Sequence, residues 1–321
     1  MKERRVLNAR FAIDNDLERR VLGRVACPLG VYPIDTDASL DEGYESRYVT
    51  GEGEFGDTFE FRILVSAERT AKLARFLFEE LLPDEVYPVY EEFSFDAYRD
   101  TDAFMSDEPA ARERFLAAWD VFGPFFIEDG KCGFGAVSFE PPMEIVVEEH
   151  GSIFISVSPT HKARVEELIE KLRLPAYEAL KCIDNFRHQH QDVLQIDADG
   201  QLMDEVDVKF AVLETFGMKA SNQEEGENVP SPALFWIECE LDTTFCKRPA
   251  RAPRSLSIGV TADDHDDAQR LLDEMVLEVP GALLARVVHH YRITEEDLNA
   301  DIAPKKRDVL AVRGVWFKAQ Q

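Results

Sequence analysis

One pattern recurs three times along the chain, a short apolar strand followed by an amphipathic helix, and it restricts the possible folds more than any other feature. The strands are expected at 61–68, 153–159 and 256–262. After each strand, apolar residues recur at intervals of three and four, which places them on one face of a helix. The pattern therefore predicts a mixed fold in which helices cover sheets.

The junctions between these strands and helices carry residues suited to helix starts. Ser66, Ser158 and Thr261 can accept hydrogen bonds from the first N–H groups of a helix, and Pro159 fits the first helical position. The three units are either related building blocks or independent occurrences of a common arrangement. The expected apolar helix faces are Leu73, Phe76, Leu77 and Leu81; Val165, Leu168, Ile169 and Leu172; and Ala268, Leu271, Leu272 and Met275.

The segments between the units add hairpins to this pattern. A helix is expected over 109–122, with a buried aromatic stripe, and Gly123-Pro124 is expected to end it. His150-Gly151 is a turn that predicts a hairpin with the strand at 153–158. Hairpins mixed with strand–helix units favour an α+β fold with helices mainly on one sheet face, and we expect ferredoxin-like sandwich arrangements. Further strands are expected at 85–91, 133–139, 143–149 and 282–289.

The length of 321 residues predicts about two domains. We expect an N-terminal α+β domain at 1–174 and a C-terminal α+β domain at 175–321, because the segment after Pro175 resumes a strand-rich pattern. An acidic, glycine-rich loop is expected at 36–57. A flexible loop is expected at 219–232, where the domain boundary could also fall.

The charge balance limits the classes of partner. Against 63 acidic residues stand 36 basic ones, which gives a net charge of −27. Nucleic-acid binding and docking on anionic membranes both need clustered Lys and Arg, so neither is expected. No apolar run approaches the length of a membrane span. The charge favours a basic protein as partner.

The cysteines indicate a reducing compartment. Five are present, at 27, 132, 182, 239 and 246, and no two have the Cys-x-x-Cys spacing of thiolate zinc sites. An odd number of cysteines does not favour a disulfide framework either. No apolar segment follows the basic start of the chain, so no signal peptide is expected, and we predict a cytoplasmic protein.

The sharpest local motif is Arg187-His188-Gln189-His190-Gln191-Asp192. On a strand, alternation places His188, His190 and Asp192 on one face. Two imidazoles and a carboxylate are a ligand set for zinc, iron or manganese, and an open position on the metal could activate water. The alternative is an exposed, polar strand end. One of His289 or His290 could supply a further ligand, since adjacent strand residues point to opposite faces.

Other polar motifs have simpler explanations. Asp197-Ala198-Asp199-Gly200 lacks the remaining ligands of a calcium loop and reads as a turn. The acidic run around His265 matches the start of a helix. A basic patch in an expected loop could bind phosphate or pair with this protein's own acidic surface. That patch consists of Lys247, Arg248, Arg251 and Arg254.

The sequence leaves the function open between different classes. The first hypothesis is a non-enzymatic binding or regulatory protein that acts through its acidic surface and needs no cofactor. The alternative is a metal-dependent, hydrolytic enzyme that holds one divalent transition metal at His188, His190 and Asp192. A small-molecule sensor is a third possibility. Neither the substrate nor the oligomeric state follows from the sequence.

Overall fold

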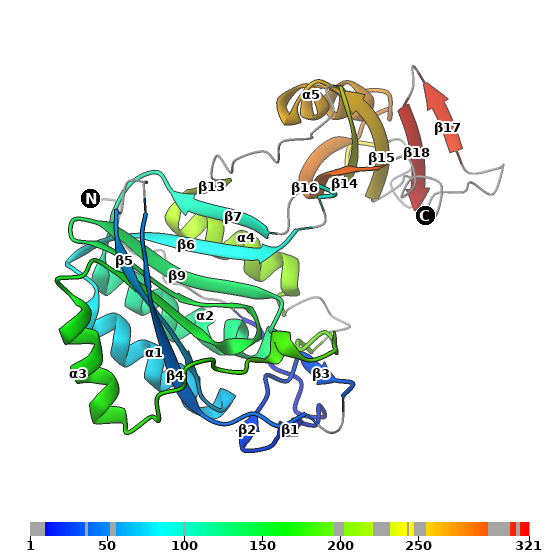
Figure 1. Cartoon of the computed structure of the whole chain (residues 1–321). Coiled ribbons are helices and arrows are strands. Elements are labelled where there is room, and N and C mark those ends of the chain that lie inside the picture. Colours follow the sequence, from blue (N-terminus) through cyan, green and yellow to red (C-terminus); the bar gives the residue numbers. More distant parts are fainter. Residues whose placement is uncertain are drawn as a thin grey trace. The chain divides into compact units, whose positions relative to one another are not determined.

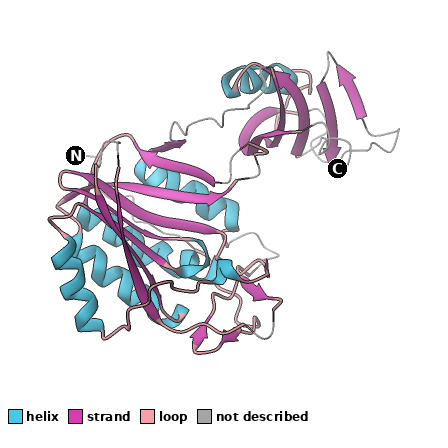
Figure 2. Cartoon of the chain, in the orientation of Figure 1, coloured by secondary structure: helices cyan, strands magenta, loops and turns pink. Residues whose placement is uncertain are grey.

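The computed structural model describes residues 10–35, 38–51, 56–94, 96–98, 101–195, 202–220, 232–242, 244–246, 255–294, 309–312 and 315–320. The chain is mixed α and β with antiparallel sheets, as the sequence predicts (Figure 2). The finer expectation of a ferredoxin-like sandwich stays a prediction. Two compact units are formed: 1–93 with 102–222, and 94–101 with 223–321.

A twisted sheet forms the frame of the first unit (Figure 1). From β6 to β4, neighbouring strands pair antiparallel. A short strand, β8 (Ala110–Ala111), pairs with β6 outside this order. The strands in spatial order are β13 (Met218–Ala220), β7 (Thr101–Ser106), β6 (Glu85–Phe93), β9 (Cys132–Phe139), β10 (Pro142–Val147), β11 (Ile153–Val157), β5 (Thr58–Leu64) and β4 (Gly43–Val49).

Alternate residues of these strands form one core with the helices of the first unit. The predicted aromatic stripe is buried there, and Phe115, Trp119 and Phe122 are each at most 3% exposed. Phe134 of β9 stacks on Phe126 with ring centroids 4.7 Å apart. The helices are α1 (Ala67–Leu81), α2 (Arg112–Asp129), α3 (Lys162–Leu172) and α4 (Glu205–Phe216).

Helix α2 continues through Gly123-Pro124, so the prediction that it ends there is wrong. The ring of Pro124 costs one helical hydrogen bond, but the following turn buries Phe125, Phe126 and Ile127 in the core. Gly123 also fits closely here, because a Cβ atom at this position would lie 2.9 Å from the Trp119 ring. Core burial therefore outweighs the local helix-breaking preference.

The acidic segment 36–57 is not a loop throughout, because residues Gly43–Val49 form strand β4. This strand pairs antiparallel with β5, from Gly43 opposite Leu64 to Val49 opposite Thr58. Polar residues fit here because β4 ends the order of the sheet, where charged side chains are favourable. The sequence prediction gave too much weight to composition and too little to the partner strand.

A smaller cluster of apolar side chains joins two distant parts of the first unit. It contains Val31 and Leu40 from the N-terminal segment and Leu180, Cys182 and Ile183 from the segment after α3. Two short ribbons accompany it, β1 (Val21–Leu22) with β2 (Val25–Ala26), and β3 (Val31–Pro33) with β12 (His188–His190). The 3-10 turns are η1 (Glu149–Gly151) and η2 (Ile183–Asn185).

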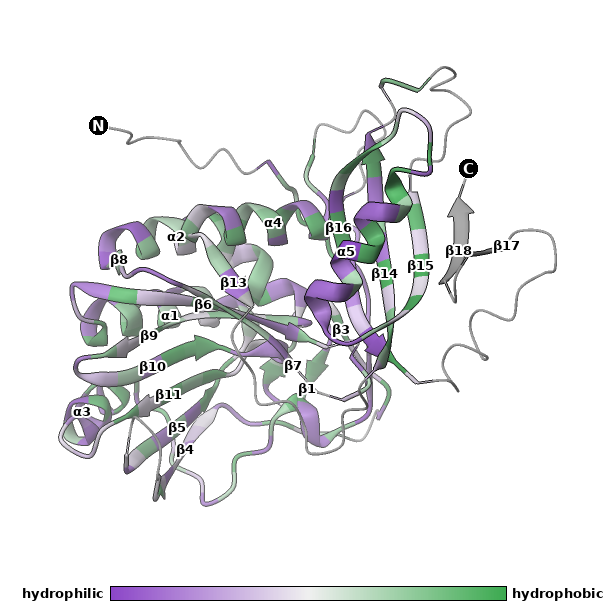
Figure 3. Cartoon of the chain, turned by 90° about the horizontal axis from the view of Figure 1, so that it is seen from above, coloured by the Kyte–Doolittle hydropathy of each residue, from purple (hydrophilic) through white to green (hydrophobic). Residues whose placement is uncertain are grey.

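In its described residues, the second unit has its own sheet, one helix and a separate apolar core. Helix α5 (His265–Val276) starts at Asp264, whose carboxylate accepts a hydrogen bond from the Asp267 N–H, rather than at Thr261. Its apolar side packs on the sheet, and Figure 3 shows hydrophilic and hydrophobic sides along it. The strand order is β16 (Leu283–Ile293), β14 (Ala233–Asp242), β15 (Ser255–Ala262), β18 (Val315–Gln320) and β17 (Val309–Val312).

A buried ion pair places residues 94–101 in the second unit. The Arg292 Nε donates to the Asp96 carboxylate over 2.9 Å, and these side chains are 3% and 0% exposed. The Arg292 backbone N–H donates to the same carboxylate, and its carbonyl accepts from the Ala97 N–H. Burial raises the pKa of Asp96, but these bonds with Arg292 outweigh it and leave the pKa below its usual value.

The compact units divide the chain differently from the expected boundary after residue 174. Residues 175–222 belong to the first unit, because β13 pairs with β7 and α4 packs in the first core. Most of the expected loop at 219–232, the Asp-Gly turn at 197–200 and the basic patch at 247–254 lie outside the described residues. Among the helices that are described, none has the length and apolarity needed to cross a bilayer.

The close approach of β9 to β10 generates a stability prediction. A Cβ atom at Gly135 would lie 2.1 Å from the Ile145 carbonyl oxygen, whereas one at Gly133 would lie 3.0 Å from the Val147 carbonyl oxygen. Gly135→Ala should therefore lower the free energy of unfolding by about 3 kcal/mol and Gly133→Ala by about 1 kcal/mol. Urea unfolding followed by circular dichroism measures both, and equal losses would contradict the prediction.

Candidate functional site

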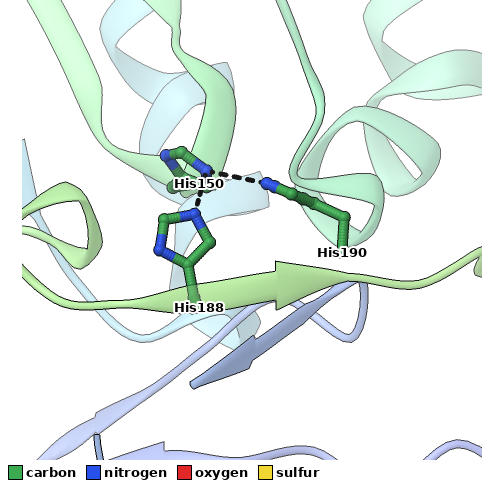
Figure 4. A group of neighbouring side chains, drawn as sticks. All are labelled: His150, His188 and His190. Carbon is green, nitrogen blue, oxygen red and sulfur yellow. Dashed lines mark hydrogen bonds between the residues drawn. The ribbon is translucent and has the colours of Figure 1, made fainter. Parts of the chain in front are cut away.

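Three histidines of the first unit point their ring nitrogens at one another (Figure 4). The Nε2 atom of His150 lies 3.0 Å from Nε2 of His188 and 3.4 Å from Nε2 of His190. We call these residues the histidine triad. His188 and His190 are two of the residues that the sequence predicts as ligands, whereas His150 is expected in a hairpin turn and is not among the predicted metal ligands.

Two different backbone features bring these side chains together. His188 and His190 project to the same side of β12, as strand alternation requires. His150 comes from the connection between β10 and β11, where its φ angle is 63°. A left-handed conformation is uncommon for a residue with a Cβ atom and often marks a functional position. At His150, the residue with this conformation is also the one whose ring faces the two histidines of β12.

The far nitrogens of His150 and His188 each have a partner outside the triad. The Nδ1 atom of His188 lies 2.9 Å from the Phe186 carbonyl oxygen, which can only accept, so Nδ1 donates. The Nδ1 atom of His150 forms an ion pair with Asp184. Burial raises the pKa of Asp184, but the bond to His150 and nearby positive charge outweigh it and hold the pKa below its usual value. The Asp184 carboxylate is therefore ionised and lies against Nδ1 of His150.

Two Nε2 atoms face each other at close range in the triad. Nε2 of His150 and Nε2 of His188 lie 3.0 Å apart, and the far nitrogen of each ring has a partner of its own. Nitrogen atoms at that distance repel unless a proton or a metal ion lies between them. A single proton could bridge two nitrogens, but a metal ion satisfies three at once. Tetrahedral zinc with Zn–N bonds of about 2.0–2.1 Å separates its nitrogen ligands by about 3.3 Å, close to the spacing observed.

His190 is held in the form that binds metals. Burial, together with the charges of His150, His188 and Lys131, lowers the pKa of His190 to about 4, so its imidazole is neutral at physiological pH. Its side chain is nevertheless the exposed member of the triad, whereas His150 is buried and His188 is half-buried. The triad is thus closed on the His150 side and open to solvent on the His190 side.

Two carboxylates adjoin the triad. Glu149, Asp184 and His150 form a second group whose potential ligand atoms lie within 4.8 Å of one another. Burial raises the pKa of Glu149, and the like charges of Asp184 and Glu148 raise it further, while His150 opposes the shift. Asp184 resembles the carboxylates that orient metal-bound histidines from their far nitrogen. Glu149 offers a proton-accepting group beside the metal ligands.

Asp192, the third predicted ligand, has another partner in this structure. Its carboxylate accepts from Lys131 Nζ over 2.8 Å, and its side chain is 80% exposed. Lys131 also donates to Glu205 at 3.0 and 3.1 Å. Among the described residues that could bind a metal together, the triad is completed by His150 and not by Asp192. His289 and His290 lie on β16 of the second unit.

Sequence reasoning missed His150 because nothing local marks it as a ligand. It stands 38 positions before His188, and the two meet only through the hairpin and the β3–β12 ribbon. The available signal was a histidine placed directly before a glycine in a hairpin connection, where an asparagine or glycine is more usual. That signal identifies an unusual turn residue but gives no metal partner.

The sheet face reached from Glu149 carries further carboxylates. Glu91 of β6 stands opposite Gly133, and Glu144 of β10 stands opposite Val137 and Ser156. Burial and the charges of Glu148 and Glu149 raise the pKa of Glu91. Burial and the charges of Glu91, Glu148 and Glu60 raise the pKa of Glu144 to about 7. These carboxyl groups therefore hold their protons more strongly than exposed glutamates.

Comparison with known proteins adds no functional assignment. No protein-family model matches the chain, and no similar curated protein or solved structure was found. The arguments about function therefore depend on the geometry of the triad and its surroundings.

The raised pKa of Glu144 predicts a pH-dependent stability. Between its usual pKa of 4.5 and about 7, the folded protein retains a proton that the unfolded chain releases, so Glu144 costs stability as pH rises. Glu144→Gln should remove this cost. We expect the variant to gain about 1–3 kcal/mol over the parent between pH 5 and pH 8.

Urea unfolding at the two pH values tests this expectation. Glu79→Gln on the solvent side of α1 is the matched control, since Glu79 is 63% exposed and pairs with Arg75. The same difference between the Glu144 variant and the parent at both pH values would show that this carboxyl does not titrate as inferred.

Proposed function

We propose that the protein is a metal-dependent hydrolytic enzyme whose single divalent transition metal, zinc in the first instance, is held by His150, His188 and His190. Three protein ligands leave one position for water, which is the arrangement of catalytic rather than structural zinc sites. The exposed position of His190 gives a substrate access to that side. The cofactor class agrees with the sequence-based alternative, but the proposed ligand set replaces Asp192 with His150.

The facing Nε2 atoms of His150 and His188 are the observation that supports this proposal most strongly. The far nitrogen of His188 donates to the Phe186 carbonyl and that of His150 lies against the Asp184 carboxylate, so the near nitrogens are turned toward each other. One proton between His150 and His188 would satisfy two of these nitrogens but not the third, Nε2 of His190, which lies 3.4 Å from Nε2 of His150. The arrangement instead matches ligands prepared for a cation, with a partner on the far nitrogen of each ring.

The residues around the triad have distinct expected roles in hydrolysis. When bound, a divalent metal ion lowers the pKa of a coordinated water and polarises a substrate carbonyl or phosphoryl oxygen. His150, His188 and His190 hold the metal, and Asp184 keeps the His150 ring in the required tautomer and orientation. Glu149, next to His150, is the candidate to take the proton that the water releases.

The hypothesis of a binding or regulatory protein stays a prediction, as do a basic protein partner and a cytoplasmic location. The first two rest on the net charge of −27, which concerns association in general and identifies no surface. The location rests on the cysteine pattern and on the expected absence of a signal peptide. The triad, by contrast, is a defined arrangement of three side chains. We therefore place the enzymatic proposal first.

The ligand set predicts metal stoichiometry. The full-length chain should bind one equivalent of Zn²⁺, and His150→Ala or His188→Ala should weaken binding at least 100-fold, because each removes one of three ligands. Asp184→Asn should weaken it about 10–100-fold through loss of the far-nitrogen partner. Competition against a chromophoric chelator gives the affinities, and elemental analysis gives the stoichiometry.

Two control variants make this test specific. His161 at the start of α3 bonds to Ser158 and has no place in the triad, so His161→Ala should keep full affinity. Asp192→Asn should also bind normally if Lys131 is its main partner. Undiminished zinc binding in the His150 variant, with loss in the Asp192 variant, would favour the ligand set predicted from sequence.

Metal-activated water predicts a characteristic pH profile. The zinc form should hydrolyse 4-nitrophenyl acetate faster than the metal-free form, with a rate that rises with pH through an apparent pKa of about 7. Glu149→Gln should lower the rate at least 10-fold and leave zinc affinity nearly unchanged. A zinc-loaded protein with the same rate as the metal-free protein would remove the enzymatic proposal while leaving the metal site intact.

A further inference from the structure

The cations beside the triad are already neutralised by carboxylates. Lys131, whose charge reaches His190, is bound by Asp192 and Glu205. Arg62, whose charge reaches Asp184, is bound by Glu148. The positive charges of Lys131 and Arg62 are therefore compensated within the protein. A phosphate or carboxylate substrate, which usually needs an unengaged Lys or Arg, would find none in these two residues.

Several carboxylates beside the same site have no such cation. In the described part of the chain, no ion pair is found for Glu149, Glu91 or Glu144. Glu149 lies beside Asp184 and His150. His150 is the buried member of the triad, only 8% exposed, and its Nε2 atom faces Nε2 of His188. Glu91 in turn feels the charges of Glu148 and Glu149. Carboxyl groups without a cationic partner thus extend from the triad onto the sheet face.

Backbone register keeps these carboxylates near one another. Glu91 stands opposite Gly133, and the next residue, Phe134, stands opposite Val147, which is followed by Glu148 and Glu149. Gly133 has no side chain to separate Glu91 from the end of β10. Because the strand pairs fix this row, the carboxylates cannot easily move apart to relieve their repulsion. A positive group from outside the protein would relieve it.

We propose that the open position of the metal centre accepts ligands that carry an ammonium group close to the metal-binding atom, so that the substrate class is esters and amides with an ammonium group near the bond to be hydrolysed. The inference rests on the proposed metal centre and adds its charge selectivity. The metal-binding atom of such a ligand takes the fourth position, and its ammonium group lies against Glu149 with Glu91 behind it. An anionic ligand of the same size is repelled by the same carboxylates.

The test uses the full chain loaded with Co²⁺, whose visible spectrum reports the ligand in the fourth position. Two thiols are titrated separately, 2-aminoethanethiol with an ammonium group and 3-mercaptopropionate with a carboxylate. The measured quantity is the ratio of their affinities in each variant. Dividing by the ratio of a control variant cancels intrinsic differences between the two thiols. Glu79→Gln is that control, because Glu79 lies exposed on α1.

We expect Glu149→Gln to reduce the preference for the ammonium thiol at least fivefold and Glu91→Gln about twofold, with Glu79→Gln unchanged. The preference of the parent should also shrink at 0.5 M salt, because screening weakens interactions with exposed charges. Circular dichroism and an unchanged cobalt spectrum before thiol addition confirm that each variant folds and holds the metal.

The other outcomes separate the two proposals. If Co²⁺ does not bind, or binds equally well after His150→Ala, the metal centre itself is wrong. If Co²⁺ binds and the ratio is the same in the parent, Glu149→Gln and Glu91→Gln, the metal centre stands and the charge selectivity is overturned. A second equivalent of Co²⁺ that is lost in Glu149→Gln would assign the carboxylates to another metal ion and also overturn it.

Discussion

The register of the antiparallel pairs β9–β10 and β10–β11 is the constraint on which the rest of the first unit depends. Because side chains alternate along a strand, this register turns Ile145 and Val147 toward the helices and Glu144 toward the opposite face. It also fixes where the chain turns between the strands, and His150 stands in that turn. A slip by one residue would expose the core residues and displace His150 from its partners.

The site needs a second, independent constraint from a small element. Strand β12 is three residues long and pairs with β3. The next residue, Gln191, holds it in place, since its backbone N–H donates to the Gly30 carbonyl and its side chain donates to the Leu29 carbonyl. A short strand with so few bonds of its own derives its position from these contacts. The triad therefore joins one rigid hairpin to one lightly held ribbon.

What the sequence could predict was local. The strand–helix units around α1, α3 and α5, the hairpin at His150 and the shared face of His188 and His190 all follow from spacing within a few residues. Strand β4, the continuation of α2 beyond Pro124 and the role of His150 do not, because each is decided by a partner far away in the chain. For β4 the partner is β5, for α2 the aromatic core, and for His150 the ribbon of β3 and β12.

The ion pair between Asp96 and Arg292 has a consequence for how the chain can be divided. It assigns a short internal segment to the second unit, so the backbone passes from one unit to the other after 93, again after 101 and again after 222. No single cut separates the units. A fragment that stops at 222 would carry Asp96 without its arginine, and a fragment that starts at 223 would bury a guanidinium without its carboxylate. Each unit is built from two separate segments of the chain. Replacing one unit with another domain would therefore require two simultaneous exchanges of sequence.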